Sequence, residues 1–360
     1  MINFTKLKKY GWDNFFEEQM DNFSKEEYSA GRVAIENKSN YLLYTEEGEI
    51  TGEVSGKFHF KNDTSSQFPA VGDWVIFRPV PGEKKATIEF VLERKNKFSR
   101  KAAFDDEDGE TKEQIIAANI DYLFIVSSLN HELNVRRIER YLSQASENEI
   151  TPVIILTKTD VCKNTEEKIA EVRTISLNTK IHALSAVQNS GIEDLKFYFE
   201  NNKTVAFVGS SGVGKSTLIN CLCGKEVMEV KDISGYKDKG RHTTSHRELI
   251  VLPNEGLIID TPGMRQMQFW EGSDGMGETF SDIEKYSEEC KFTDCKHETE
   301  PGCAILKAIE NGELDESRFK NYVKLQKEVR HFENRNNQKA KLAEKKKWKK
   351  ISNDQKKFKK

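Results

Sequence analysis

The chain contains the stretch Gly209-Ser210-Ser211-Gly212-Val213-Gly214-Lys215-Ser216-Thr217, which fits the pattern G-x-x-x-x-G-K-[ST] without a substitution. An apolar run at 205–208 precedes it, and a helix-like segment at 216–222 follows it. Between a strand and a helix, such a glycine loop points successive backbone N–H groups at phosphate oxygens. The stretch therefore predicts a P-loop that binds a nucleoside triphosphate, with Lys215 at the β- and γ-phosphates and Ser216 on Mg²⁺.

The bulk composition limits the class of protein. Of the 360 residues, 32% are charged and 36% hydrophobic, and six are cysteines. No apolar run approaches the ~18 residues of a membrane span, and the first residues lack an apolar signal core. The cysteines are too few and too clustered for a disulfide framework. We therefore expect a cytoplasmic protein of two or three domains without a membrane partner.

Charge is distributed unevenly along the chain. Residues 331–360 hold twelve Lys/Arg and three Asp/Glu, a net charge of +9, which leaves −12 for the preceding 330 residues. A basic tail on an acidic body favours a nucleic-acid partner. The alternative is a solvated tail that only aids solubility.

Five short β-rich runs follow a helical lead-in at residues 1–30. They span 32–35, 41–44, 52–60, 73–77 and 86–92, and turn residues separate them. This strand count predicts a small barrel at 31–111, and an OB-fold has five strands. OB-folds often bind RNA or single-stranded DNA. An SH3-like barrel or a purely structural module is the alternative. The basic run at 94–101 and the acidic run at 105–110 indicate an exposed linker after the barrel.

From residue 115 onward, apolar strand patterns alternate with amphipathic helix patterns. This alternation predicts a mostly parallel α/β sheet that is covered on both faces. The strands are expected at 122–126, 152–156, 180–184, 205–208, 248–252 and 257–260, and the helices at 135–145, 166–174 and 192–199.

Polar motifs follow these strands where each of them ends, and in such folds ligands bind beyond the carboxyl ends of the strands. The motifs match the guanine-nucleotide-binding elements of a small GTPase. Asp160 would accept hydrogen bonds from guanine N1–H and N2, Asp260 would hold Mg²⁺ through water, and Gly263 N–H would contact the γ-phosphate. The four motifs are Thr157-Lys158-Thr159-Asp160, Ser185-Ala186, Gly240-Arg241-His242-Thr243-Thr244 and Asp260-Thr261-Pro262-Gly263.

Each short motif is weak alone, but together they supply every contact that the nucleotide needs. Lys158 would lie along the base and brace the P-loop, and the backbone of Ser185-Ala186 would meet guanine O6. Thr243 or Thr244 would close over Mg²⁺ and the γ-phosphate. The order of the motifs is unusual, because the base-reading motifs precede the P-loop. This order predicts a circularly permuted domain, which a closed α/β fold tolerates since its termini lie near each other.

A further motif lies near the C-terminus. Cys290, Cys295, His297 and Cys303 fall within fourteen residues and suit one tetrahedral Cys₃His zinc site. With all four positions filled by protein, the zinc would be structural.

The combination of OB-like barrel, permuted GTPase and Cys₃His module resembles the ribosome small-subunit-dependent GTPase A family over nearly the whole chain. The resemblance implies a GTP-hydrolysing enzyme, stimulated by the small ribosomal subunit, that acts late in the maturation of that subunit and contacts its rRNA. It implies a GTPase domain at 112–272, a zinc-binding domain at 273–337 and a basic tail at 338–360, in a monomeric protein. The motifs that carry it include Pro69-Ala70-Val71-Gly72-Asp73-Trp74-Val75, Ala117-Ala118-Asn119-Ile120-Asp121, Asp294-Cys295-Lys296-His297 and Glu300-Pro301-Gly302-Cys303.

Two positions depart from the pattern of GTPases. Thr157 replaces the usual Asn of N-K-x-D, which predicts retained guanine selectivity with lower affinity. Met264 stands where many GTPases place a water-orienting glutamine, so we expect slow intrinsic hydrolysis. His242 and His246 are the candidates within the chain for the missing group. The other residues expected to take part in catalysis are Lys215, Thr243 and Thr244. Two alternative functions stay open: an RNA-binding scaffold that GTP switches with negligible turnover, and a P-loop ATPase or kinase.

Overall fold

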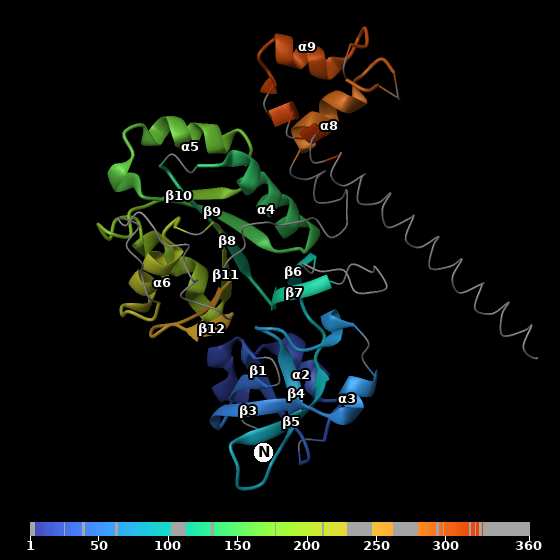
Figure 1. Ribbon diagram of the computed structural model, residues 1–360, viewed down its shortest axis with the longest axis vertical. Helices are drawn as coiled ribbons and strands as arrows, with labels where there is room; N and C mark the ends of the chain where they lie inside the picture. The colour runs from blue at the N-terminus through green and yellow to red at the C-terminus, as the bar shows by residue number, and fades with distance from the viewer. Residues whose placement is uncertain are drawn as a thin grey trace, which may run out of the picture. The chain divides into compact units, whose positions relative to one another are not determined.

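The computed structural model divides into two compact units, residues 1–100 with 113–268 and residues 101–112 with 269–360 (Figure 1). No helix in its described part is long and apolar enough to cross a membrane. The structure describes residues 4–24, 26–37, 40–61, 64–101, 113–130, 133–176, 178–210, 212–228, 247–261, 280–292, 295–297, 299–316, 318–320, 322–323 and 326.

The first unit begins with three short helices and a closed five-stranded barrel. The strands follow the order β1-β2-β3-β5-β4, and β4 pairs back onto β1. Alternate residues point into the barrel, so that Val33, Leu43, Val75 and Ile88 form its fully buried interior. The OB-like barrel of the predicted fold class is thereby confirmed. Its elements are α1 (Phe4–Leu7), η1 (Lys8–Tyr10), α2 (Asn14–Met20), β1 (Ser29–Glu36), β2 (Tyr41–Thr45), β3 (Gly48–Val54), β4 (Trp74–Pro79) and β5 (Lys85–Val91).

Two expectations about this region are wrong. The run 52–60 is not one strand, because β3 ends at Val54 and the helix α3 (Gly56–Lys61) follows. Ser55 explains the change, since its Oγ accepts a hydrogen bond from Phe58 N at 3.1 Å and so caps the helix. The segment after the barrel is not simply a linker, because β6 (Lys97–Lys101) pairs with β7 (Glu113–Ala118) and Phe98 is fully buried.

The GTPase domain is a sheet with helices on both faces. Its strands follow the order β10-β9-β8-β11-β13-β12, and all neighbours are parallel except β12 with β13. In β8, Leu123 and Ile125 pack toward α4 and α5, while Phe124 and Val126 pack toward η4 and α6. The elements are β8 (Tyr122–Ser128), α4 (Val135–Glu147), β9 (Thr151–Thr157), η3 (Thr159–Val161), α5 (Thr165–Arg173), β10 (Lys180–Ala183), η4 (Glu193–Asn202, a 3₁₀ helix), β11 (Thr204–Val208), α6 (Lys215–Cys223), β12 (Glu248–Val251) and β13 (Leu257–Asp260).

Barrel and GTPase domain share one hydrogen-bonded sheet. Ile35 of β1 pairs with Glu248 of β12, and Tyr44 Oη donates to the Leu249 carbonyl at 3.1 Å. Arg32 lies fully buried under the barrel and donates to the carbonyls of Gly72, Tyr10 and Asn119. It thereby ties the lead-in, the barrel and the chain entering the GTPase domain together.

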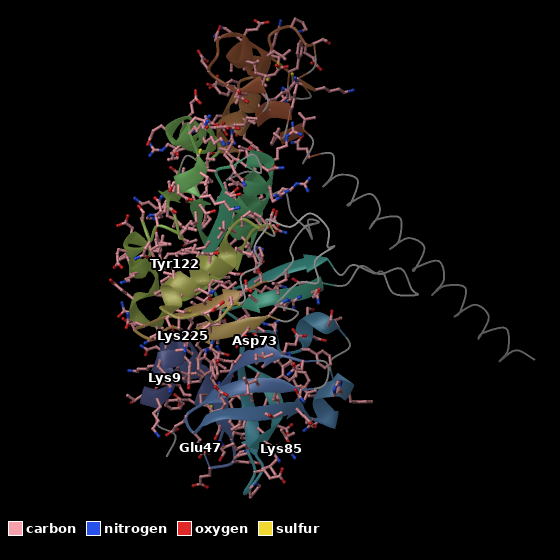
Figure 2. The ribbon with its side chains drawn as sticks, turned by 60° about the vertical axis from the view of Figure 1, so that its left-hand side comes forward. Lys9, Glu47, Asp73, Lys85, Tyr122 and Lys225 are labelled. Atoms are coloured by element: carbon pink, nitrogen blue, oxygen red, sulfur yellow. The ribbon has the colours of Figure 1, made fainter. Side chains whose placement is uncertain are left out.

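Within the barrel, Glu47 and Lys85 lie toward one end and Asp73 toward the other (Figure 2). Asp73 is fully buried, and both of its carboxylate oxygens accept hydrogen bonds from Arg94 at 2.7–2.8 Å. A bidentate pair of this kind fixes the chain that leaves β5 against the start of β4.

The described residues of the second unit form a small helical cluster. It contains α8 (Ser281–Glu288) and α9 (Ala304–Glu310), which pack around Phe280, Ile283 and Ile305. Arg318 is 3% exposed and donates two hydrogen bonds of 2.8 Å to the Asp282 carboxylate. This pairing fastens the chain after α9 to the first turn of α8.

Candidate functional site

The phosphate side of the site is the loop between β11 and α6. Gly209 has φ +147°, and a Cβ there would lie 2.2 Å from the Val126 carbonyl oxygen. Gly214 has φ +96° and immediately precedes the first turn of α6. Both positions therefore require glycine, and the loop leads directly into the first turn of α6, where a helix N-terminus favours an anion.

Lys215 lies inside this loop. Its Nζ donates to the carbonyls of Gly209 and Ser210 at 2.7 and 2.8 Å. Burial lowers the pKa of Lys215 to about 8, and the nearby Asp260 carboxylate opposes that shift. Burial also raises the pKa of Asp260, which is 4% exposed at the end of β13. The two groups thus lie within electrostatic reach of each other at the carboxyl edge of the sheet.

The base-reading motif contacts the P-loop directly. Thr157, at the end of β9 and 2% exposed, donates its hydroxyl to the Val213 carbonyl at 2.5 Å. Lys158 has φ +63°, and its Nζ donates to the Gly212 carbonyl at 2.7 Å. Thr157 therefore supplies through its hydroxyl a link to the P-loop, although it replaces the usual asparagine.

Asp160 and Ser185 come together from the ends of neighbouring strands. Ser185 Oγ donates to Asp160 Oδ1 at 2.5 Å, and Gln188 N donates to Ser185 Oγ at 3.2 Å. These bonds orient the exposed Asp160 carboxylate. Ser185 N–H donates to the Ser190 carbonyl at 3.0 Å, so Ala186 N–H is the better placed donor for a base oxygen.

Several predicted site residues lie outside the described residues: Ser211, His242, Thr243, Thr244, His246, Gly263 and Met264. The predicted nucleotide-site residues that the structure does describe lie between Thr157 and Asp260. They are found at the carboxyl ends of β9, β10, β11 and β13 or in the first turn that follows each of these strands.

One contact at this edge was not predicted from the sequence. Arg137, in the first turn of α4, donates through Nη1 to Ser210 Oγ in the P-loop. The sequence feature that could have indicated this contact is the pair of arginines at 136–137, which lies in the first turn of the helix that follows β8. Arg137 adds a second cation beside the phosphate loop.

The four predicted zinc ligands form a compact cluster, with all ligand atoms within 4.8 Å of one another. Cys290 Sγ lies 3.9 Å from Cys303 Sγ, and His297 Nδ1 lies 3.4 Å from Cys303 Sγ and 3.6 Å from Cys290 Sγ. A tetrahedral zinc with ordinary bond lengths gives S–S and S–N separations of about 3.8 and 3.6 Å. The cluster fits one such ion.

The surroundings of the cluster also suit a metal. Burial raises the pKa of the Cys290 thiol, but hydrogen bonds from the backbone of Ala304 and Ile305 and with Cys303 and Cys295 together hold that pKa below the usual value. Ser287 Oγ lies 3.4 Å from His297 Nε2, the ring nitrogen that faces away from the cluster. Such a partner fixes the orientation of a metal-binding imidazole.

A P-loop, the exposed Asp160 carboxylate predicted to read the base and a buried aspartate lie on one sheet edge, an arrangement typical of P-loop GTPases. Comparison with known proteins places this chain more narrowly. The family model described as RsgA GTPase matches residues 91–270, and one described as 50S ribosome-binding GTPase matches residues 204–343. The chain belongs to the RsgA GTPase family, as the resemblance predicted, and is a GTP-hydrolysing enzyme.

Curated relatives match nearly the full chain. The Small ribosomal subunit biogenesis GTPase RsgA of Opitutus terrae is 40% identical over 96% of this chain and 95% of its own length. The RsgA 1 protein of Oceanobacillus iheyensis, which carries the same description, is 41% identical over 91% of this chain and 92% of its own.

Solved structures share the fold. YjeQ from Thermotoga maritima superposes with a TM-score of 0.60 at 29% identity and covers 84% of this chain and 98% of its own. YloQ, described as a circularly permuted GTPase, has a TM-score of 0.58 at 26% identity over 84% of this chain and 96% of its own. The permuted order inferred from the motifs is thereby confirmed.

Proposed function

We propose that this chain is a GTPase that the small ribosomal subunit stimulates and that acts late in the maturation of that subunit, as a checkpoint or release factor. The observation that carries the proposal is the contact between base-reading motif and P-loop, in a chain that aligns almost end to end with proteins named for small-subunit biogenesis. The 50S description belongs to a model that matches only 204–343, so it carries less weight for the choice of subunit. This role would place the protein in the cytoplasm.

The proposed roles follow the geometry. Asp160, oriented by Ser185, would accept from guanine N1–H and N2, which adenine cannot supply. Lys215 and the P-loop N–H groups would hold the phosphates. Ser216, Asp260 and Thr243 would hold Mg²⁺, which neutralises phosphate charge when bound. Thr157, Lys158, Thr159 and Ala186 would complete the base site, and Gly263, Thr244 and His242 the γ-phosphate side.

The other parts of the chain receive proposed roles in the same scheme. The barrel at 31–111 and the zinc-binding domain at 273–337 would contact rRNA from two attachment points on the GTPase domain at 112–272. The tail at 338–360 would add phosphate contacts. Cys290, Cys295, His297 and Cys303 would bind one structural Zn²⁺, since their spacing fits a closed tetrahedral site.

The test is multiple-turnover hydrolysis of GTP by the purified chain, alone and with stoichiometric small subunits, with large subunits and ATP as controls. We expect slow turnover alone and strong stimulation that is specific for GTP and for the small subunit. Asp160→Asn should lose GTP affinity and gain affinity for xanthosine triphosphate, because an amide donates where the carboxylate accepts.

The alternative, a GTP-switched RNA-binding scaffold with negligible turnover, gives a different pattern. It predicts GTP-dependent binding to small subunits with no stimulated phosphate release. That result would leave the site assignments in place and remove the enzymatic role on the ribosome.

A further inference from the structure

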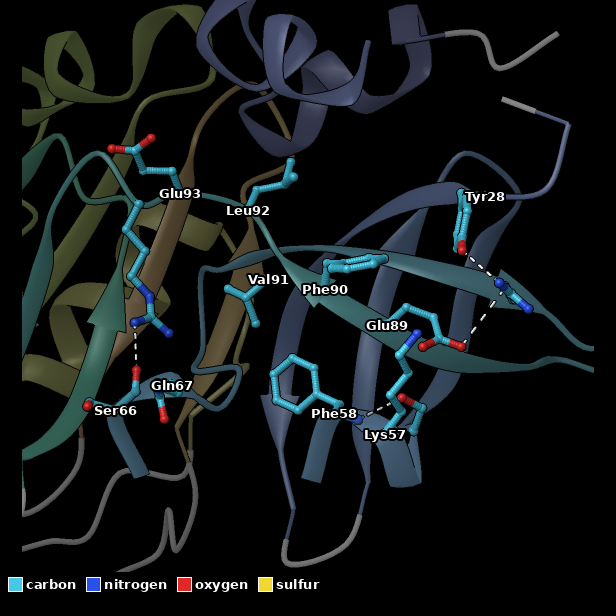
Figure 3. Close-up of a pocket in the computed structure, with 13 residues that line it drawn as sticks. Tyr28, Lys57, Phe58, Ser66, Gln67, Glu89, Phe90, Val91, Leu92 and Glu93 are labelled. Carbon is cyan, nitrogen blue, oxygen red and sulfur yellow. Dashed lines mark hydrogen bonds and ion pairs between the residues drawn. The ribbon is translucent and has the colours of Figure 1, made fainter. Parts of the chain in front are cut away.

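The wall of the barrel contains a cavity of about 630 Å³ that GTP hydrolysis does not use. It lies between β5 and the segment formed by α3 and η2 (Ser65–Gln67), and Figure 3 shows its lining. Phe58, Phe90 and Val91 form its middle. The Arg94–Ser66 hydrogen bond lies toward one end, and Tyr28 with Glu89 lies toward the other. Its size is that of a small-molecule or nucleotide site.

The aromatic rings of the cavity are held in place from behind. Phe90 packs against Phe23 and Tyr28, with ring centroids 5.0 and 6.2 Å apart, yet it stays 39% exposed. Phe58 packs against Phe68 at 5.5 Å. Phe58 is 6% exposed, so Phe90 is the cavity ring that offers accessible surface, and its aromatic neighbours reduce the side-chain ordering that stacking costs.

The helix α3 adds an exposed ring outside the cavity and a cation at its mouth. Phe60 of α3 is 90% exposed, and the exposed Lys57 stands three residues before it. Residues at this spacing lie next to each other on a helix surface. Lys57 also lines the cavity, so α3 carries an ammonium group at its mouth.

Charge distinguishes this side of the barrel from the β2–β3 side that OB-folds ordinarily use. The β2–β3 hairpin exposes Glu47 and Glu49, which would repel a phosphate backbone. The cavity side offers Lys57 at the rim. Within the cavity, the Glu89 carboxylate lies 3.9 Å from Arg78 Nε and can accept from the edge of a base. The Gln67 oxygen accepts from Thr64, so its Nε2 amide group is the one that can donate to a base.

We propose that this cavity and α3 bind an unpaired base of single-stranded RNA together with its neighbouring phosphate. The proposal rests on the proposed function, since it names the element through which the barrel contacts rRNA. The base stacks on Phe90 with its edge toward Gln67 and Glu89, Lys57 contacts the phosphate, and the next base along the strand stacks on Phe60 outside the cavity. Single-stranded loops are required, because a duplex keeps its base faces stacked.

The experiment titrates a short, fluorescently labelled, unstructured RNA with the full-length protein over a range of salt concentrations. Phe60→Ser and Phe90→Ser should weaken binding by roughly 5- to 150-fold for each stacked base, with the salt slope unchanged. Lys57→Ala should flatten the salt slope by about 0.7. The matched control is Phe197→Ser, which removes a ring that is 65% exposed on η4 of the GTPase domain and should change nothing.

Wild-type affinity in both phenylalanine variants, or no RNA binding by the wild-type chain, overturns the proposal. Loss of small-subunit association with unchanged RNA affinity also overturns it, since the cavity would then contact a protein. Stimulated GTP hydrolysis is measured in parallel. If small subunits do not stimulate the wild-type chain but Phe90→Ser still loses RNA affinity, the proposed function fails while the RNA site stands.

Discussion

Replacing Thr157 with valine removes one hydroxyl and leaves the shape of the side chain nearly unchanged. The hydroxyl donates to the Val213 carbonyl at 2.5 Å, and both residues are 2% exposed. A buried carbonyl without its donor costs about 1–3 kcal/mol. Because this carbonyl belongs to the P-loop, the cost falls either on the folded, nucleotide-free protein or on the nucleotide-bound loop.

Two measurements distinguish these possibilities, the free energy of unfolding and the affinity for nucleotide. The losses of free energy in the two measurements add up to the cost of the unpaired carbonyl. If the free loop keeps its conformation, the free energy of unfolding in urea drops by the full amount. If the free loop relaxes and water satisfies the carbonyl, the affinity for a fluorescent GDP analogue falls by roughly 5- to 150-fold instead. Thr157→Ser keeps the hydroxyl and serves as the control. Should Thr157→Val match Thr157→Ser in both unfolding and GDP binding, the hydroxyl does not brace the P-loop.

Three more predictions concern other parts of the chain. Burial lowers the pKa of Lys215 to about 8, and bound phosphate favours the ammonium form, so GDP affinity should fall up to about ten-fold per pH unit above 8. Lys215→Arg should flatten this pH profile, because arginine stays charged above pH 8. GDP itself titrates equally in both experiments, so the difference between the two profiles reports the side chain at position 215. Cys303→Ser should abolish stoichiometric zinc in elemental analysis and unfold the second unit with GDP affinity unchanged. Arg32→Met should lower the unfolding free energy in urea by about 3–5 kcal/mol, because the carbonyls of Tyr10 and Asn119 lose their donor and that of Gly72 keeps only the bond from Asn119 Nδ2; an unchanged midpoint would contradict its bridging role.

Short sequence patterns were enough to predict the parts of the site that depend on backbone conformation. The P-loop glycines could be predicted from the sequence because their positive φ angles disfavour any side chain. At Gly209 the Val126 carbonyl also leaves no room for one. The clustering of Cys290, Cys295, His297 and Cys303 could be predicted because all four lie within one short segment. The strands of the GTPase domain were readable because both of their faces are buried, which demands continuous apolar runs.

The errors arose where a short pattern suits two structures. Lys57-Phe58-His59-Phe60 alternates like a strand, but the cap at Ser55 starts a helix there. Lys97-Phe98-Ser99-Arg100 reads as a charged linker, yet pairing with β7 buries Phe98. In both cases a tertiary or capping contact outweighs the local preference.

The sequence by itself determined that this chain binds a guanine nucleotide in a permuted α/β domain, because motif chemistry and motif order are properties of the linear chain. Only the tertiary structure showed that Thr157 hydrogen-bonds to the P-loop, that Arg137 reaches Ser210, and that β1 extends the GTPase sheet through β12. These contacts join residues 56 or more positions apart in the chain. Such pairings depend on how whole elements pack, and no local pattern of residues encodes them.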